Sequence, residues 1–123
     1  IYGPGRTRLL TQLRRSRPGP SSDAAGAYSN RIHRHDCAGI LAHVLSLDEA
    51  APLYLGVDSE PTTRETVLEW LAAENLLLEQ PDAPAPVRQS RHGANKRCAN
   101  ALIAASGYSF RYPTFREGYQ SLI

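Results

Sequence analysis

The sequence predicts an α/β protein that is built mostly of helices with a few short strands. The apolar run LYLGV at residues 53–57 is short and continuous, which predicts a strand buried on both faces. Residues 36–47 carry apolar side chains at helical spacing, which predicts an amphipathic helix. Thr62 and Glu65 have the spacing of a capping box and predict the start of another helix.

The first part of the chain is predicted to be a turn, a short helix, a loop and an extended segment. Pro4 and Gly5 supply the turn, and leucines at helical spacing predict a helix over residues 6–14. Residues 16–30 are rich in Pro, Gly and Ser, which is typical of a surface loop. Residues 31–34 are predicted to be extended and to lead into the helix that follows.

The middle of the chain is predicted to hold two helices with the strand between them. Asp36 is expected to cap the first helix, because an Asp side chain at the N-cap can accept a hydrogen bond from a first-turn amide. The apolar stripe of this helix comprises Cys37, Ile40, Leu41, Val44 and Leu45. The strand needs neighbouring strands to cover its edges. The second helix is expected to turn Val67, Leu68 and Leu71 inward and to end near Asn75.

The last part of the chain begins with a Pro-rich loop at residues 79–93. Residues 95–106 are predicted to be a helix that ends at Gly107 in a left-handed conformation. Residues 108–112 are predicted to be an edge strand. The final helix is expected to begin with a capping box of Thr114 and Glu117 and to present Phe115, Tyr119 and Leu122 on one face.

Charge is unevenly distributed along the chain, although the net charge is only +2. Residues 1–35 carry seven Arg against one Asp, residues 48–82 nine acidic side chains against one Arg, and residues 83–123 six bases against one Glu. This pattern fits a nucleic-acid surface, a pocket for a phosphate-bearing molecule, or segments that pack on one another. The basic aromatic run YSFRYPTFR after short helices leaves a small winged-helix-like nucleic-acid-binding or regulatory domain as the alternative.

The residues alone predict no complete active site. The string HRHDC at residues 33–37 offers metal-ligand types, but the two other histidines supply too few further ligands, so no metal site is predicted. The serines have no adjacent base, and no Gly-rich phosphate loop is present. Cys37 and Cys98 lack metal or redox spacing and are expected to be reduced, half-buried thiols.

Four strings, taken in order, resemble the C-terminal part of an extended short-chain dehydrogenase/reductase, the superfamily of NAD-dependent nucleotide-sugar epimerases and dehydratases. IYGPGR resembles the segment that leaves the sixth strand of the nucleotide-binding domain, and NRIHRHDCAGIL resembles the strand-to-helix signature N-R-I-H-V-D-D-x-A. YLGVDSEPTTRETVLEWLA resembles the strand-turn-helix that follows. NKRCANALIAASGYSFRYPTFREGYQSLI resembles the closing segment of a bacterial subgroup of epimerase/dehydratase-like proteins. The resemblance covers nearly the whole chain, and Arg34 and His35 depart from the signature.

The resemblance implies the C-terminal, substrate-binding part of a Rossmann-type enzyme. Residues 1–15 would be the end of the nucleotide-binding domain and a first connecting helix, and residues 16–123 the substrate-binding region. Members of the family bind NAD or NADP and catalyse with a Ser/Thr and a Tyr-x-x-x-Lys pair. No Tyr of this chain is followed four residues later by Lys, so no catalytic residue carries over and the chain alone is expected to be inactive.

The resemblance also implies candidate binding residues. The YGPG stretch of the family passes close to the nicotinamide, so Tyr2, Gly3 and Pro4 are cofactor-side candidates, with a plain turn as the alternative reading. The C-terminal domain of the family clamps a substrate diphosphate with guanidinium groups. The substrate-side candidates are therefore Arg6, Arg31, Lys96 and Arg97.

The expected partners are a small-molecule substrate and an N-terminal Rossmann half that is absent from this chain, with a homodimer left open. The chain has no Met and opens on an apolar residue entering a turn, so it is expected to belong to an enzyme of roughly 250 to 350 residues. No nucleic-acid partner is expected. No apolar run approaches the roughly 20 residues of a bilayer span, so no membrane association and a cytoplasmic location are expected.

Overall fold

The computed structural model describes residues 1–15, 27–74 and 95–123, and these fall into two compact units. The first unit consists of Ile1–Arg6, Asn30–Pro61 and Arg97–Ile123. The second unit takes its described residues from Thr7–Ser29 and Thr62–Lys96. Helices dominate both units, so the predicted mixture of helices with little strand is confirmed at this coarse level.

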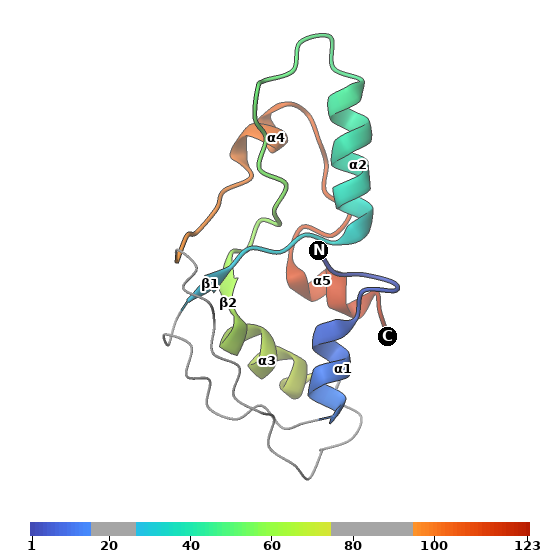
Figure 1. Cartoon of the computed structure of the whole chain (residues 1–123), viewed down its shortest axis with the longest axis vertical. Helices are drawn as coiled ribbons and strands as arrows, with labels where there is room; N and C mark the ends of the chain where they lie inside the picture. The colour runs from blue at the N-terminus through green and yellow to red at the C-terminus, as the bar shows by residue number, and fades with distance from the viewer. Residues whose placement is uncertain (16–26, 75–94) are drawn as a thin grey trace. The chain divides into compact units, whose positions relative to one another are not determined.

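The second unit contains α1 (Arg8–Arg15), β1 (Tyr28–Ser29), β2 (Thr62–Thr63) and α3 (Arg64–Ala73). The two strands pair antiparallel, with Tyr28 opposite Thr63 and Ser29 opposite Thr62 (Figure 1). The predicted first helix is confirmed with a start two residues later. Strand β1 lies at the end of the segment for which a loop was predicted.

Helix α3 is capped one residue later than predicted. Its N-cap is Thr63, whose hydroxyl accepts a hydrogen bond from the Thr66 amide over 3.2 Å. The capping box of Thr62 and Glu65 is therefore wrong, because Thr62 is an extended residue of β2. Val67 and Leu71 are fully buried, as predicted for the inner face. The predicted stop at Asn75 and the loop at residues 79–93 lie outside the described residues.

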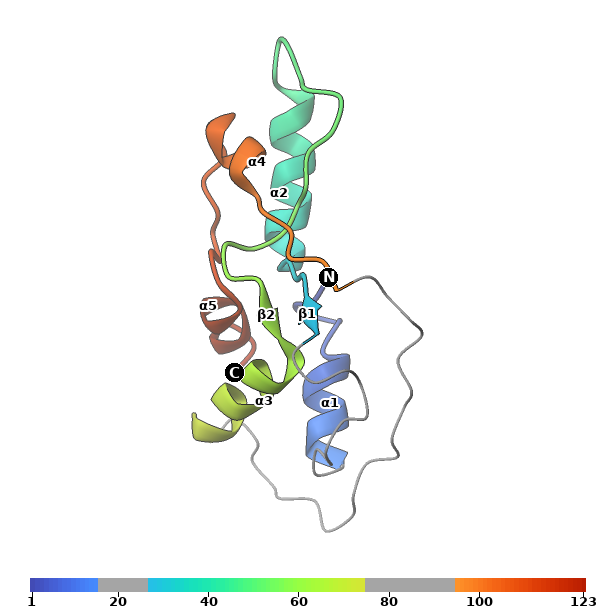
Figure 2. The same ribbon diagram turned by 90° about the vertical axis from the view of Figure 1, so that its left-hand side faces the viewer.

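The first unit is built on α2 (Arg34–Leu45), α4 (Ala101–Ala105) and α5 (Phe115–Gln120). Its core contains Ile32, Ile40 and Ile103, and the residues packed on these three are Cys37, Val44, Tyr54, Tyr108 and Phe110. Helix α2, the segment that returns from it and α4 lie side by side in both views (Figures 1 and 2). The imidazole Nε2 of His43 lies 3.0 Å from the Ser106 hydroxyl, which joins α2 to the end of α4.

The strand predicted at residues 53–57 is not formed. The segment belongs to no ladder, the Val57 amide donates back to the Leu55 carbonyl over 3.2 Å, and Leu53 and Leu55 are 69% and 44% exposed. Tyr54 packs on the core, so the side chains alternate as in a strand. A strand also requires a hydrogen-bonded neighbour, and the described residues provide none for this segment.

The predicted inner stripe of α2 is only partly buried. Ile40 is 7% exposed and lies in the core, whereas Leu41 and Leu45 are 63% and 86% exposed. The apolar face of α2 is thus wider than the surface that the described residues cover. Cys37 and Cys98 are both free and half-buried, as predicted.

The helix predicted at residues 95–106 is restricted to α4. The Asn100 amide group donates to the Val57 carbonyl over 3.1 Å and to the Ser59 hydroxyl over 2.9 Å, so this side chain does not cap the helix. The Cys98 amide donates to the side chain of Asn30 over 2.9 Å. These side-chain contacts hold the preceding residues in a non-helical path. Gly107 has φ +96°, the left-handed conformation predicted for it.

The predicted edge strand at residues 108–112 is also absent, since the Arg111 and Tyr112 amides donate to a side chain instead of a neighbouring strand. The β wing required by a winged-helix domain is therefore not formed by these residues. The capping box of Thr114 and Glu117 is confirmed at the start of α5. Phe115 and Tyr119 on this helix are buried.

None of the helices in the described ranges combines the length and the apolar character that a bilayer span needs.

Candidate functional site

The N-terminal turn is held against the start of α2 by backbone hydrogen bonds. The Tyr2 amide donates to the Ile32 carbonyl over 3.1 Å, and the Arg34 amide donates to the Tyr2 carbonyl over 2.7 Å. Gly3 has φ +141°, and a Cβ there would lie 2.6 Å from Cγ of Arg34. Only glycine fits this close approach, so the YGPG turn packs directly against the side chain of Arg34.

An aromatic cluster lies beneath this turn. The ring of Tyr2 stacks on Tyr119 at 4.5 Å and meets His33 edge-on at 5.4 Å, and His33 lies 4.0 Å from the ring of Tyr112. A Cβ on Gly118 would lie 1.9 Å from the hydroxyl oxygen of Tyr2. Tyr2 is therefore locked in the interior by the glycine of α5.

A buried carboxylate adjoins this cluster. Asp58 is 2% exposed, its Oδ1 accepts from the Glu60 amide over 3.2 Å, and its own amide donates to the Arg31 carbonyl over 2.7 Å. Burial raises the pKa of Asp58 to about 6, against the opposing effects of the Glu60 amide and the Arg31 charge. Burial likewise lowers the pKa of Arg31, whose guanidinium is hydrogen-bonded to the Tyr119 hydroxyl. The guanidinium of Arg31 thus interacts with buried groups of its own unit, Tyr119 and Asp58.

Three buried polar atoms have no hydrogen-bond partner within the described part of the chain: Tyr2 Oη, His33 Nε2 and Asp58 Oδ2. Their residues are 7%, 1% and 2% exposed. Burial raises the pKa of Tyr2 far above its usual range, with the charge of Asp58 adding to the effect. Burial lowers the pKa of His33, as do the charges of His35, Arg111 and Arg34. These groups are poorly placed to exchange protons with a dissolved substrate, because water does not reach them.

Asp36 does not cap α2 as predicted. The N-cap is His33, whose Nδ1 accepts from the His35 amide over 3.3 Å, and Asp36 lies buried in the first turn. Its carboxylate accepts from the Tyr108 hydroxyl over 2.9 Å and from the amides of Arg111 and Tyr112 over 2.7 and 2.9 Å. Asp36 therefore fixes the C-terminal segment to the start of α2.

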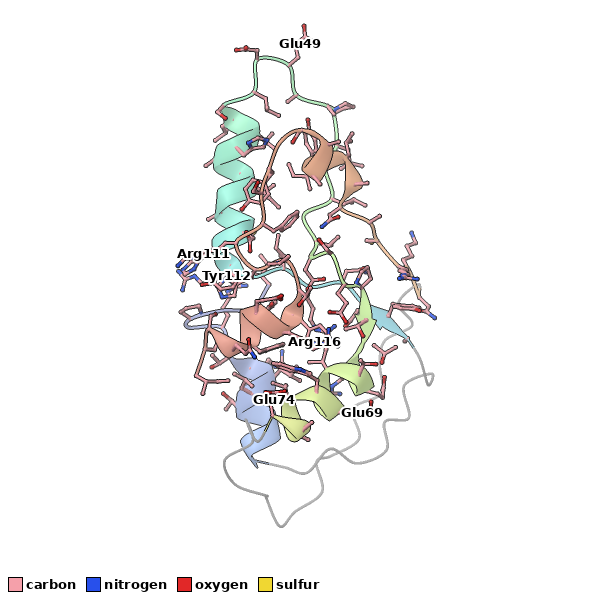
Figure 3. All side chains as sticks on the ribbon, turned by 180° about the vertical axis from the view of Figure 1, so that it is seen from behind. Glu49, Glu69, Glu74, Arg111, Tyr112 and Arg116 are labelled. Carbon is pink, nitrogen blue, oxygen red and sulfur yellow. The ribbon has the colours of Figure 1, made fainter. Side chains whose placement is uncertain are left out.

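Basic side chains surround this junction on the outside. Arg34, His35 and Arg111 are exposed, and all three charges lower the pKa of the buried His33. The Arg34 guanidinium donates to the Pro4 carbonyl. The guanidinium of Arg111 lies 5.4 Å from the Tyr112 ring centroid, and both side chains lie at the start of α2 (Figure 3). We refer to Arg34, His35 and Arg111 as the basic rim.

Sequence reasoning did not assign the basic rim to a site. In the sequence, Arg34 and His35 are distinguished only by their departure from the family signature. Arg111 belongs to the basic aromatic run, and its position beside them depends on hydrogen bonds to Asp36 from 75 residues along the chain. The departure of these two residues from the signature is the sequence feature that points to the basic rim.

The structure brings only some of the predicted site residues together. Tyr2 and Gly3 are buried in the turn, and Pro4 is exposed. Arg31 is half-buried, and Arg97 is exposed in a segment joined to it by the contact between Cys98 and Asn30. Arg6 is exposed at the end of the turn, and its amide donates to the Gly3 carbonyl. Lys96 is exposed and directly precedes Arg97; it is the last residue of the second unit, and Arg97 begins a segment of the first.

The described residues contain no group of three His, Cys, Asp or Glu side chains that could hold a metal ion. In the string at residues 33–37, His33 and Asp36 are buried and His35 is exposed. The carboxylate of Asp36 is occupied by the three donors described above. No residue in these ranges is therefore assigned to a metal.

Comparison with known proteins gives one informative match. No protein-family model matches the chain, and a search of curated proteins gives no match. Among solved structures, the chain is similar to a protein from Methylobacillus flagellatus that is provisionally named an NAD-dependent epimerase/dehydratase, with 34% sequence identity and a TM-score of 0.74. The match covers 99% of this chain and 43% of that protein, so the chain spans less than half the length of this relative.

Proposed function

We propose that the chain is the C-terminal, substrate-binding region of an NAD(P)-dependent extended short-chain dehydrogenase/reductase of the epimerase/dehydratase type. The observation that carries this proposal is the match of nearly the whole chain, at 34% identity and a TM-score of 0.74, to part of a protein with that name. The four family strings occur in the expected order along the same residues. In the complete enzyme, the missing half would bind the nicotinamide cofactor and supply the catalytic residues.

The role proposed for this region is to bind and orient the substrate. A nucleotide sugar or a similar polar hydroxyl compound is proposed as the substrate, held by its phosphates. The exposed Arg6 and Arg97 of the first unit are proposed as contacts to these phosphates, because a guanidinium group can bind phosphate oxygens directly. Lys96 is kept as a separate substrate-side proposal. Arg31 is proposed to act on substrate binding through its hydrogen bond to Tyr119, since burial and that bond already engage its guanidinium. Holding the reacting carbon in one orientation lowers the entropic part of the barrier.

In the turn, the exposed Pro4 is the residue proposed to face the cofactor directly, while Tyr2 and Gly3 fix the path of the turn beside Arg34. The chemistry supplied by the bound cofactor would be hydride transfer to and from the substrate carbon. The residues of this chain would position the substrate for that transfer and exclude water.

The proposal is tested by cofactor binding to two forms of the protein. NAD(H) should leave the melting temperature of the 123-residue chain unchanged, because the dinucleotide site lies in the absent half. The native polypeptide that carries this chain should be stabilised by NAD(H) or NADP(H), since a ligand that binds only the folded state raises its stability. A clear shift for the 123-residue chain, or none for the native polypeptide with either cofactor, would contradict the proposal.

A nucleic-acid-binding domain is the alternative that the same samples can test. Phosphate neutralisation makes DNA affinity fall steeply with salt. The proposal expects no salt-sensitive binding of a labelled duplex. Residues 108–112 form no β wing, the element that a winged-helix domain would need.

A further inference from the structure

The basic rim gathers positive charge at the start of α2. Arg34 and His35 open the helix, Arg111 lies beside them, and all three side chains are exposed (Figure 3). Within the described residues, no carboxylate forms an ion pair with any of the three. The family signature N-R-I-H-V-D-D-x-A has an apolar and an acidic residue where this chain has Arg34 and His35, so the rim is not part of that signature.

The backbone beneath the rim is held in place by hydrogen bonds. The Arg34 amide donates to the Tyr2 carbonyl over 2.7 Å, and the Arg111 amide donates to the Asp36 carboxylate over 2.7 Å. The His35 amide is also bonded, to a side chain of the same junction. A ligand at the rim would therefore meet cations whose backbone is already ordered, which reduces the entropic cost of binding.

A buried donor without a partner lies behind the rim. His33 is 1% exposed, and its Nδ1 accepts a hydrogen bond from the His35 amide. In the neutral imidazole that burial favours, the proton is therefore on Nε2. This Nε2 has no partner among the described residues and lies 3.1 Å from the position that a Cβ on Gly3 would take. Cγ of Arg34 lies 2.6 Å from the same position, so the unpaired donor faces the stem of a rim arginine.

We propose that the basic rim binds a phosphate group, carried by a small phosphate ester or diphosphate. The guanidinium groups of Arg34 and Arg111 would bind its oxygens, because their planar forks match phosphate geometry. As the Arg34 stem moves off Gly3 to hold the phosphate, one oxygen would become the acceptor that Nε2 of His33 lacks. The first turn of α2 adds the end of the helix dipole that favours anions.

The rim stands on residues of this chain, whereas the source of its ligand rests on the proposed function. In the proposed enzyme, both a nucleotide-sugar substrate and the dinucleotide cofactor carry phosphate. The shared chemistry is the phosphate group itself, and nucleotides of the two kinds can be tested separately.

The direct test is titration of inorganic pyrophosphate into the native polypeptide, followed by calorimetry at constant ionic strength. Arg34→Gln and Arg111→Gln each remove one charge and keep most of the side-chain stem. Each should weaken pyrophosphate binding by about 5-fold or more. The matched control is Arg64→Gln, at an exposed arginine of the second unit, which removes the same charge and should change the affinity by less than about 2-fold. No binding to the wild-type protein, or equal weakening in all three variants, would overturn the inference.

Two further variants separate phosphate contact from a general effect of charge or folding. Arg111→Lys keeps the charge but not the fork, so it should bind pyrophosphate more tightly than Arg111→Gln and less tightly than the wild type. The double variant Arg34→Val, His35→Asp restores the signature residues and should weaken binding by about 20-fold or more. The single variants should melt within about 2 °C of the wild type, since the side chains are exposed. A double variant that binds pyrophosphate as the wild type does would contradict the proposed site.

Nucleotide titrations then identify the source of the phosphate. Weaker binding of uridine diphosphate to Arg34→Gln, with unchanged binding of NAD(H) and NADP(H), assigns the rim to the substrate. Weaker binding of NAD(H) or NADP(H) assigns it to the cofactor.

Two outcomes distinguish failure of this inference from failure of the proposed function. A native polypeptide that binds NAD(H) or NADP(H), while its rim variants bind pyrophosphate as the wild type does, overturns the rim and leaves the function in place. Pyrophosphate binding that depends on the rim, in a polypeptide that binds neither cofactor, supports the rim and contradicts the proposed function.

Discussion

The hydroxyl of Tyr108 donates a hydrogen bond to the carboxylate of Asp36 over 2.9 Å, across 72 residues of sequence. The amides of Arg111 and Tyr112 donate to the same carboxylate. This single buried side chain therefore determines where the C-terminal segment meets α2, and with it the position of Arg111 in the basic rim.

Replacing Asp36 should destabilise the protein strongly. In Asp36→Asn, one of the accepting oxygens becomes an NH2 group that faces a backbone donor. The expected loss is about 3 kcal/mol, the cost of leaving a buried donor unpaired at a charge-assisted site. Tyr108→Phe removes a single donor and should cost about 1 kcal/mol. Urea unfolding followed by circular dichroism measures both, and similar losses for the two variants would contradict the central role of Asp36.

Gly118 should not tolerate a methyl group. A Cβ there would lie 1.9 Å from Oη and 2.6 Å from Cζ of Tyr2, so Gly118→Ala must displace a buried ring. We expect a loss of about 2–3 kcal/mol. The matched control is Gly56→Ala, where the new Cβ would make contacts of 3.5 and 3.6 Å and the change should stay within about 1 kcal/mol. Comparable stability of the two variants would show that Tyr2 is not packed against α5.

Asp58 should make stability depend on pH in the opposite sense from a salt-bridged carboxylate. The pKa of Asp58 is about 6 in the folded protein, whereas an ordinary Asp has a pKa of 3.8. The folded state therefore binds this proton more tightly than the unfolded state does. Stability is therefore gained as the pH falls through 6 toward 4, and ionised Asp58 costs up to about 3 kcal/mol at neutral pH. His33 acts in the other direction, because its lowered pKa makes stability fall as the pH drops below its usual value near 6.5.

The variant Asp58→Asn isolates this contribution. It should be more stable than the wild-type chain at pH 7.5, and the difference should shrink as the pH is lowered to 4.5. Urea midpoints at several pH values provide the measurement. A difference that grows on acidification would mean that Asp58 is stabilised as a carboxylate.

Variants at Arg31 and Arg97 should have different effects, the first on stability and the second on substrate binding. Arg31→Ala removes the charge beside the buried Asp58 and the hydrogen bond to Tyr119, so a loss of about 2 kcal/mol is expected. Arg97→Ala changes an exposed side chain and should alter stability by less than about 0.5 kcal/mol. Under the proposed function, Arg97→Ala in the native polypeptide should raise KM for a diphosphate substrate with little change in melting temperature. An Arg97→Ala variant with unchanged KM would contradict the proposed role of Arg97 in substrate binding.

The features predicted well from sequence are those determined by neighbouring residues. The capping box of Thr114 and Glu117 and the left-handed Gly107 depend on residues a few positions apart, and both are found. The N-cap of α2 is His33 and not the predicted Asp36, because Asp36 accepts hydrogen bonds from residues 108–112, which no local pattern reveals. The LYLGV segment has a strand sequence, but pairing depends on a partner that local sequence does not supply.

In the candidate site, too, the local features could be predicted from sequence and the long-range contacts could not. The sequence YGPG predicts a turn, and the approach of Arg34 explains why Gly3 is required in it. The engagement of Arg31 with Tyr119 and the burial of Asp58 required the packing of α5, which is separated from both in sequence.

The most direct test of the account is the intact mass of the native protein that carries this chain, measured after purification from its source cells. The relative of which this chain spans 43% sets the expected size, so a polypeptide of about 30 kDa is predicted, with an NAD(P)-binding half before residue 1. A native mass of 13.5 kDa would contradict the account, because no polypeptide would then exist to hold the cofactor and the catalytic residues.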